Sequence, residues 1–241
     1  MTKYYDKSTQ ELMIEYFKKI NLQSEQEFKK QDITNWFNKN YPKIKNNTIQ
    51  CHLIKLSVNA NSRKHYNPSD DGQDDILYQI NSNTFKLYDK IKDGIIFSPV
   101  NIKSVDDDKV SQEFAYEKDL QNYLSKNLSI IEPGLKVFDD DGIIGIEYPI
   151  YGRFIDILAL DKENNFVIIE LKVSKGYDKV IGQLLLYKSL IKKYLSEKDQ
   201  KVRGMIICKE ITDDLRLACS DINDIELFEY ELSIKLQKKE I

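Results

Sequence analysis

Cysteine and histidine are scarce in this sequence of 241 residues, which has three cysteines and two histidines. Cys51, Cys208 and Cys219 are odd in number and show no Cys-x-x-Cys spacing, which argues against a disulfide framework and a thiolate zinc site. We expect all three to be small core residues. His52 and His65 lie in the first third of the chain, where we expect surface or core roles and not catalysis.

Long hydrophobic runs are also absent. No apolar run approaches the roughly 18 to 20 residues that span a membrane, and residues 1–6 lack the hydrophobic region of a signal peptide. The 41% hydrophobic content is enough for one large core or two modest ones. The sequence therefore predicts a soluble, cytoplasmic, globular protein with no membrane partner.

A global excess of positive charge is missing, because the formal net charge is −3. Charge is nevertheless uneven, with eight basic and two acidic residues between Gln26 and Tyr66. A local basic face can attract DNA even when the whole molecule is acidic. An ordinary solvated helix surface gives the same composition, so both interpretations stay open.

The first 90 residues show three helical patterns followed by two strands. The helices are predicted at residues 11–20, 32–40 and 47–58, and the strands at residues 75–80 and 84–88. This order is typical of a winged helix-turn-helix, whose third helix would enter the major groove and expose Gln50, Lys55 and Asn59 to DNA. The alternative is a small helical cap that only packs on the rest of the chain.

The remaining sequence predicts a mixed α/β domain. We place a small α+β, winged helix-turn-helix-like domain at residues 1–90, a linker at 91–110 and the second domain at 111–241. Helices are predicted at residues 111–127, 177–195 and 213–219, and strands at 135–138, 143–150, 153–160, 166–173, 204–208 and from 225. This alternation favours a central mixed sheet flanked by helices.

Three charged residues interrupt two of these apolar strands. Asp156 lies in R-F-I-D-I-L-A-L, and Glu170 and Lys172 lie in V-I-I-E-L-K-V. Neighbouring strands would bring the two carboxylates together, where they repel each other unless a proton or a divalent cation lies between them. Oxygen ligands suit Mg²⁺ or Mn²⁺, and the lysine could stabilise an attacking hydroxide or a phosphate. A buried ion network without catalysis is the alternative.

The spacing Asp156, thirteen residues, Glu170-Leu171-Lys172 resembles the signature of the PD-(D/E)xK nuclease superfamily. The surrounding residues 152–173, followed by Q-L-L-L-Y at 183–187, resemble the nuclease domain of NucS-like endonucleases. The resemblance covers about residues 111–232 and implies a restriction-endonuclease-like fold. Tyr148-Pro149 departs from the superfamily name, which would place an aspartate after the proline.

The resemblance also implies roles for individual residues. Asp156 and Glu170 would hold the Mg²⁺ or Mn²⁺, and Lys172 would position or activate water. Gln183 and Tyr187, four apart on one helical face, would line the active site and touch the phosphate backbone. The remaining candidates are Glu117 as the acid of the preceding helix, Glu113 as its competitor, and Arg153 as a phosphate contact.

The function expected from these residues is that of a metal-dependent DNA endonuclease, restriction-like or repair-like. The first domain would recognise double-stranded DNA. Cutting both strands needs two active sites, so a homodimer is a further expectation. The alternatives are a non-catalytic DNA-binding regulator with a nuclease-like fold, and an RNA nuclease.

Overall fold

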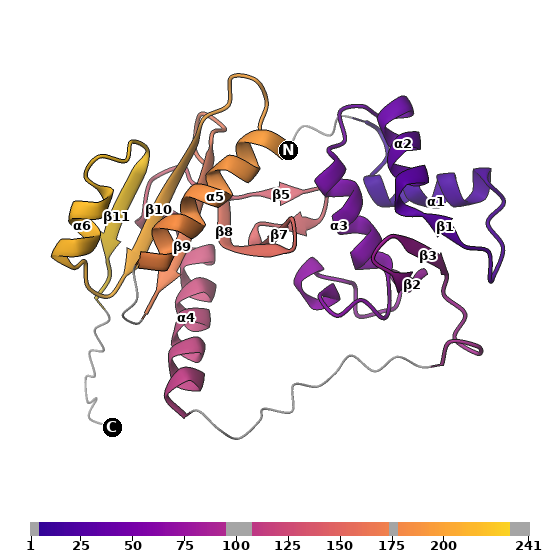
Figure 1. The fold of residues 1–241 in the computed structure, drawn as a ribbon, viewed down its shortest axis with the longest axis horizontal. Coiled ribbons are helices and arrows are strands. Elements are labelled where there is room, and N and C mark those ends of the chain that lie inside the picture. The colour runs from indigo at the N-terminus through magenta and orange to yellow at the C-terminus, as the bar shows by residue number, and fades with distance from the viewer. Residues whose placement is uncertain (1–4, 95–107, 174–177, 232–241) are drawn as a thin grey trace, which may run out of the picture.

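The computed structural model of the chain describes residues 5–94, 108–173 and 178–231 (Figure 1). The chain forms two parts that lie side by side, and the predicted linker falls largely on residues 95–107, outside the described ranges. No helix in the described part of the chain is long and apolar enough to cross a membrane. The side chain of Glu113 also lies outside what is described.

The first part contains three helices and a three-stranded antiparallel sheet. Its elements are α1 (Thr9–Lys19), β1 (Phe28–Lys29), α2 (Lys30–Asn40), α3 (Asn46–Leu56), the 3-10 helix η1 (Arg63–Tyr66), β2 (Leu77–Asn81) and β3 (Thr84–Leu87). The strands are ordered β1-β3-β2. The predicted order of three helices and a hairpin is confirmed, whereas β1 was missed because two residues leave no readable pattern.

Local chemistry fixes the first helix. Ser8 and Glu11 form a capping box, in which the Ser8 hydroxyl accepts from the Glu11 N–H and the Glu11 carboxylate accepts from the Ser8 N–H. The buried face of α1 then packs Leu12 and Phe17 against the core of the first part. That core also holds the apolar faces of α2 and α3 and two phenylalanines of the sheet, Phe28 and Phe85.

The second part is a six-stranded mixed sheet with helices on both faces (Figure 1). Its elements are α4 (Asp108–Lys126), η2 (Leu128–Ile130), β4 (Lys136–Val137), β5 (Asp139–Asp140), β6 (Ile143–Ile144), β7 (Ile146–Ile150), β8 (Arg153–Leu160), β9 (Phe166–Lys172), α5 (Asp178–Tyr194), β10 (Val202–Cys208), α6 (Asp213–Cys219) and β11 (Ile225–Glu229). The sheet order is β11-β10-β9-β8-β4, with β7 also paired to β8. The predicted mixed α/β fold is confirmed.

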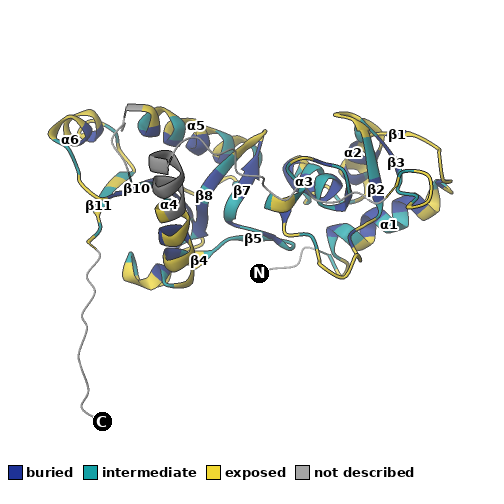
Figure 2. Ribbon diagram, turned by 90° about the horizontal axis from the view of Figure 1, so that it is seen from below, coloured by how far each residue is buried: buried dark blue, intermediate teal, exposed yellow. Residues whose placement is uncertain are grey.

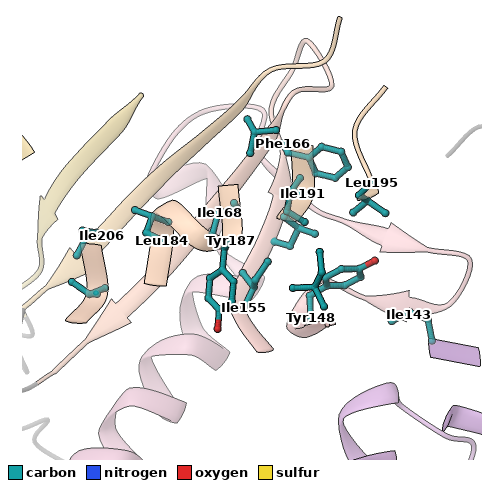
Figure 3. Packing of buried hydrophobic residues seen from close by; sticks show 14 of the residues in the cluster. Ile143, Tyr148, Ile155, Phe166, Ile168, Leu184, Tyr187, Ile191, Leu195 and Ile206 are labelled. Carbon is teal, nitrogen blue, oxygen red and sulfur yellow. The ribbon is translucent and has the colours of Figure 1, made fainter. Parts of the chain in front are cut away.

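The two faces of the sheet carry separate apolar cores. Helix α4 packs Leu120 and Leu124 against Ile157 and Ile169 on one face. Helix α5 packs Leu184 and Tyr187 against the other, and Figure 3 shows both beside Ile155, Ile168 and Ile206. The three cysteines are buried and free, as predicted.

Helix α3 lies between the two parts (Figure 2). Leu53 belongs to the core of the first part, whereas Cys51 belongs to the core under α5. The Asn47 amide donates to the Tyr148 hydroxyl and to the Pro149 carbonyl, at 3.3 and 3.2 Å. Helix α3 thus packs on both parts, and its predicted role in reading a DNA groove stays a prediction.

The predicted strand at 143–150 is divided in two at Gly145. Its N–H donates to the Phe138 carbonyl and its carbonyl accepts from the Leu158 N–H, at 2.7 and 2.8 Å. A Cβ here would lie 2.2 Å from the Leu158 carbonyl oxygen and 2.9 Å from that of Phe138. Both contacts are with backbone, so the second part requires glycine at this position.

Gly145→Ala should therefore lower the free energy of unfolding by at least about 2 kcal/mol, because the backbone must shift to admit the methyl group. The matched control is Gly182→Ala on α5, where no described atom lies within 4 Å of the added Cβ. That variant should gain about 0.5 to 1 kcal/mol from helix propensity. Denaturant unfolding measures both; equal effects would contradict the packing described for Gly145.

Candidate active site

The two predicted carboxylates meet where β8 and β9 separate. The paired register between these strands ends at Ile157 and Ile169. Past this last pair, the Asp156 carboxylate accepts a hydrogen bond from the backbone N–H of Leu171 at 2.8 Å. This bond stands in place of a backbone hydrogen bond between the two strands. The two strands are thus held apart at the position where Asp156 and Glu170 face each other.

Glu170 is fully buried, and neither carboxylate oxygen makes a hydrogen bond of good geometry with the described residues. Burial and the neighbouring Asp156 carboxylate raise the pKa of Glu170, and the Lys172 ammonium and the Asp156 backbone N–H only partly offset them. Asp156 is partly exposed, and the burial of most of its side chain raises its pKa too. The pair therefore needs a proton or a cation to balance its charge.

Helix α4 completes the other wall of the site. The Lys172 ammonium lies 3.6 Å from the Glu117 carboxylate, so the predicted lysine and the predicted helix acid are brought together. Gln121, one turn after Glu117, is buried and donates to the backbone carbonyl of Asp156 at 2.8 Å. Gln121 was missed in the sequence because a single glutamine on a helix carries no distinctive pattern.

Gln183 and Tyr187 approach from α5. The Gln183 amide donates to the Tyr187 hydroxyl at 3.1 Å, and that hydroxyl donates to the Phe154 carbonyl at 2.8 Å. Tyr187 is buried and its hydroxyl already has a backbone acceptor, and its contact with a phosphate stays a prediction. Its contacts are those of a residue that orients Gln183 and anchors α5 to β8.

The predicted DNA contacts lie in different places. Arg153 is exposed at the start of β8, three residues before Asp156. Lys55 lies 3.8 Å from Asp74, and Asn59 exchanges hydrogen bonds with the Gln79 backbone, both at 2.8 Å. The structure does not bring Gln50, Lys55 or Asn59 together with the nuclease site, and DNA contact by these three stays a prediction.

A small cavity of about 50 Å³ opens beside Asp156. Its lining residues are Glu117, Lys118, Gln121, Glu147, Asp156 and Leu171. Glu147 was missed in the sequence, because it lies in an ordinary stretch at the start of β7. Three of the lining residues are acids, so the cavity is lined by carboxylate oxygens that could bind a cation.

The donor set fits Mg²⁺ or Mn²⁺. Asp156 and Glu170 offer oxygen ligands, and Glu170 has no partner of good geometry among the described residues. No three described side chains of His, Cys, Asp or Glu are grouped closely enough to hold an ion by themselves. Two protein carboxylates with water or phosphate oxygens in the other positions are usual for Mg²⁺.

Two sequence profiles match the chain. The endonuclease NucS C-terminal domain matches residues 116–236, half of the chain. The chain belongs to the NucS C-terminal domain family. The predicted resemblance to NucS-like endonucleases is therefore confirmed. Residues 8–87 match a domain of unknown function, DUF7669.

Several relatives share this second part. The endonuclease NucS of Methanopyrus kandleri is 27% identical over 110 residues, which cover 46% of this chain and 39% of that protein. The endonuclease NucS of Methanocaldococcus jannaschii is 33% identical over 96 residues, which cover 40% and 34%. The chain thus spans less than two fifths of the length of these relatives.

Solved structures resemble the chain more distantly. A repair endonuclease from Pyrococcus abyssi gives a TM-score of 0.40 at 20% identity, over 62% of this chain and 53% of that one. A structure described as an EndoMS-dsDNA2 complex gives 0.39 at 18% identity, over 64% and 53%.

Glu170→Gln should stabilise the protein in the absence of divalent cations. A carboxyl group with a raised folded-state pKa costs stability as the pH rises above its ordinary value of 4.5 toward the raised value. The variant removes that cost and should gain on the order of 2 kcal/mol at pH 8, with little gain near pH 4. Thermal unfolding in a chelator measures this.

The matched control is Glu163→Gln, an exposed acid in the turn between β8 and β9. It should change stability little at either pH. Adding Mn²⁺ should raise the melting temperature of the wild type and not that of Glu170→Gln. A gain in stability that does not depend on pH would contradict the burial cost assigned to Glu170.

Proposed function

We propose that the protein is a metal-dependent DNA endonuclease that hydrolyses phosphodiester bonds. The observation that carries the proposal is the fully buried Glu170, which faces Asp156 of an acidic cavity, with Lys172 paired to Glu117 of the same cavity lining. A structural ion network would leave no buried carboxylate without a partner, since such a group costs free energy and contributes no contact.

Each residue has a distinct task in this proposal. Asp156 and Glu170 would hold Mg²⁺ or Mn²⁺, which when bound supplies Lewis-acid stabilisation of the negative charge on phosphate. Lys172 orients the attacking water and stabilises the charge that develops on the phosphate. Glu117 keeps the Lys172 ammonium directed toward the site, at 3.6 Å. Gln183 and Arg153 contact the DNA backbone.

The relatives favour a repair-like role over a restriction-like one. The two curated relatives are named endonuclease NucS, and the Pyrococcus abyssi structure is described as a repair endonuclease. Another structure is described as a complex with double-stranded DNA, which is the substrate we propose here. Two such sites in a homodimer would cut both strands.

The first test is cleavage of supercoiled plasmid, mixed-sequence duplex and flapped or mismatched DNA with Mn²⁺. Asp156→Ala should reduce the rate roughly a thousandfold or more, because several kcal/mol of transition-state stabilisation depend on the cation. Lys172→Ala should act similarly, whereas Asp199→Ala and Lys198→Ala, at exposed positions after α5, should cut like the wild type. Gel electrophoresis of the products measures all of these.

The products separate the candidate roles. Discrete fragments from intact duplex would indicate a restriction-like enzyme, and cuts only at flaps or mismatches a repair enzyme. Preferential degradation of competing RNA would favour the RNA nuclease. No cation-dependent cutting, together with tight duplex binding, would replace the proposal with the non-catalytic regulator.

A further inference from the structure

Glu147 joins the first part of the chain to the nuclease cavity. One of its oxygens accepts from the Lys118 ammonium of α4 at 3.1 Å. The other pairs with Nδ1 of His65, which belongs to η1 of the first part. Because a carboxylate can only accept, the imidazole is the donor in this contact. A residue of each part therefore holds the same carboxylate.

The backbone of Glu147 is unusual. Its φ of 48° lies in the left-handed region, where a side chain other than glycine costs about 1 kcal/mol or more. Such conformations persist where the surroundings fix them, and they concentrate at functional sites. Here Lys118 and His65 hold the carboxylate and the pairing of β7 holds the backbone, so the side chain is kept in the lining of the cavity.

The charge of Glu147 acts on the site itself. Glu147 lines the cavity together with Asp156 and Glu117. A further carboxylate in this lining adds negative charge to the cavity, which makes it more attractive to a divalent cation.

His65 is itself firmly placed. Its ring packs on that of Phe154, with centroids 4.3 Å apart and an interplanar angle of 36°. Phe154 lies on β8, two residues before Asp156, and its carbonyl accepts from Tyr187. The imidazole thus lies between Phe154 of β8 and Glu147. Among the described residues, this is the one contact we find between the first part and a residue of the cavity lining.

We propose that Glu147 is a positioning residue of the nuclease centre, whose carboxylate adds negative charge to the cavity beside Asp156, and that His65 of the first part holds it there. The inference rests on the function proposed above. It gives the first part a role in the nuclease centre that does not depend on reading DNA through α3. A carboxylate that merely joined two parts would gain on the order of 1 kcal/mol from partly exposed ion pairs and would not need a strained backbone facing the cavity.

The test is Mn²⁺ affinity of the full chain, measured by titration calorimetry without DNA. Glu147→Gln should weaken Mn²⁺ binding by about 10-fold or more, as loss of an outer-shell partner does. His65→Ala should weaken it in the same direction, and His65→Asn should restore most of the affinity because its amide can replace the Nδ1 donor. In cleavage assays, both weakened variants should need more Mn²⁺ and recover when it is saturating.

The matched control is Thr48→Val. It removes another hydrogen bond between the two parts, from the Thr48 hydroxyl to Asp140 at 2.8 Å, remote from the cavity lining. It should lower the melting temperature without changing Mn²⁺ affinity. If Glu147→Gln and His65→Ala also leave the affinity unchanged, the contact only joins the two parts and the inference is overturned.

The wild type separates this inference from the proposed function. Wild-type protein that binds Mn²⁺ but cuts no DNA would refute the nuclease, while the variants would still decide the role of Glu147. Wild-type protein that binds no Mn²⁺ would overturn both.

Discussion

The burial of one acid next to another is the constraint on which the rest of the second part depends. Glu170 has no exposed surface and faces Asp156 across two separating strands. A sheet does not tolerate this arrangement for its own stability, because each carboxylate raises the cost of ionising the other. Helix α4 supplies Gln121 and Glu117 to organise the opening, and α5 closes the opposite side through Tyr187.

Much of this arrangement could be read from the sequence, because charged residues in apolar strands stand out. Asp156, Glu170 and Lys172 were identified in this way, and the bounds of β8 and α6 agree with the predicted ones. Glu117 was selected from the resemblance, and the structure places its carboxylate beside Lys172. Gln121 and Glu147 were not found, since their positions depend on long-range packing that leaves no local pattern.

In the first part, the sequence predicts the secondary structure but not which surface each helix packs against. The order of its helices and hairpin agrees with the prediction, but the sequence does not predict what the second face of α3 packs against. Both faces of that helix carry residues that suit a protein interior, and the sequence does not say whether the second face meets DNA or protein. In the structure Asn47 and Cys51 meet the second part, and His65, expected in a surface or core role, contacts Glu147 of the acidic cavity.

The position of α3 has a consequence for how the molecule comes apart. The helix contributes Leu53 to one core and Cys51 to the other, so it is packed into both parts and does not act as a hinge between them. Unfolding of either part removes packing contacts from the other part and exposes the buried Asn47 and Tyr148 to water together. The two parts are therefore expected to melt in a single cooperative transition, in contrast to modules that are joined only by a tether.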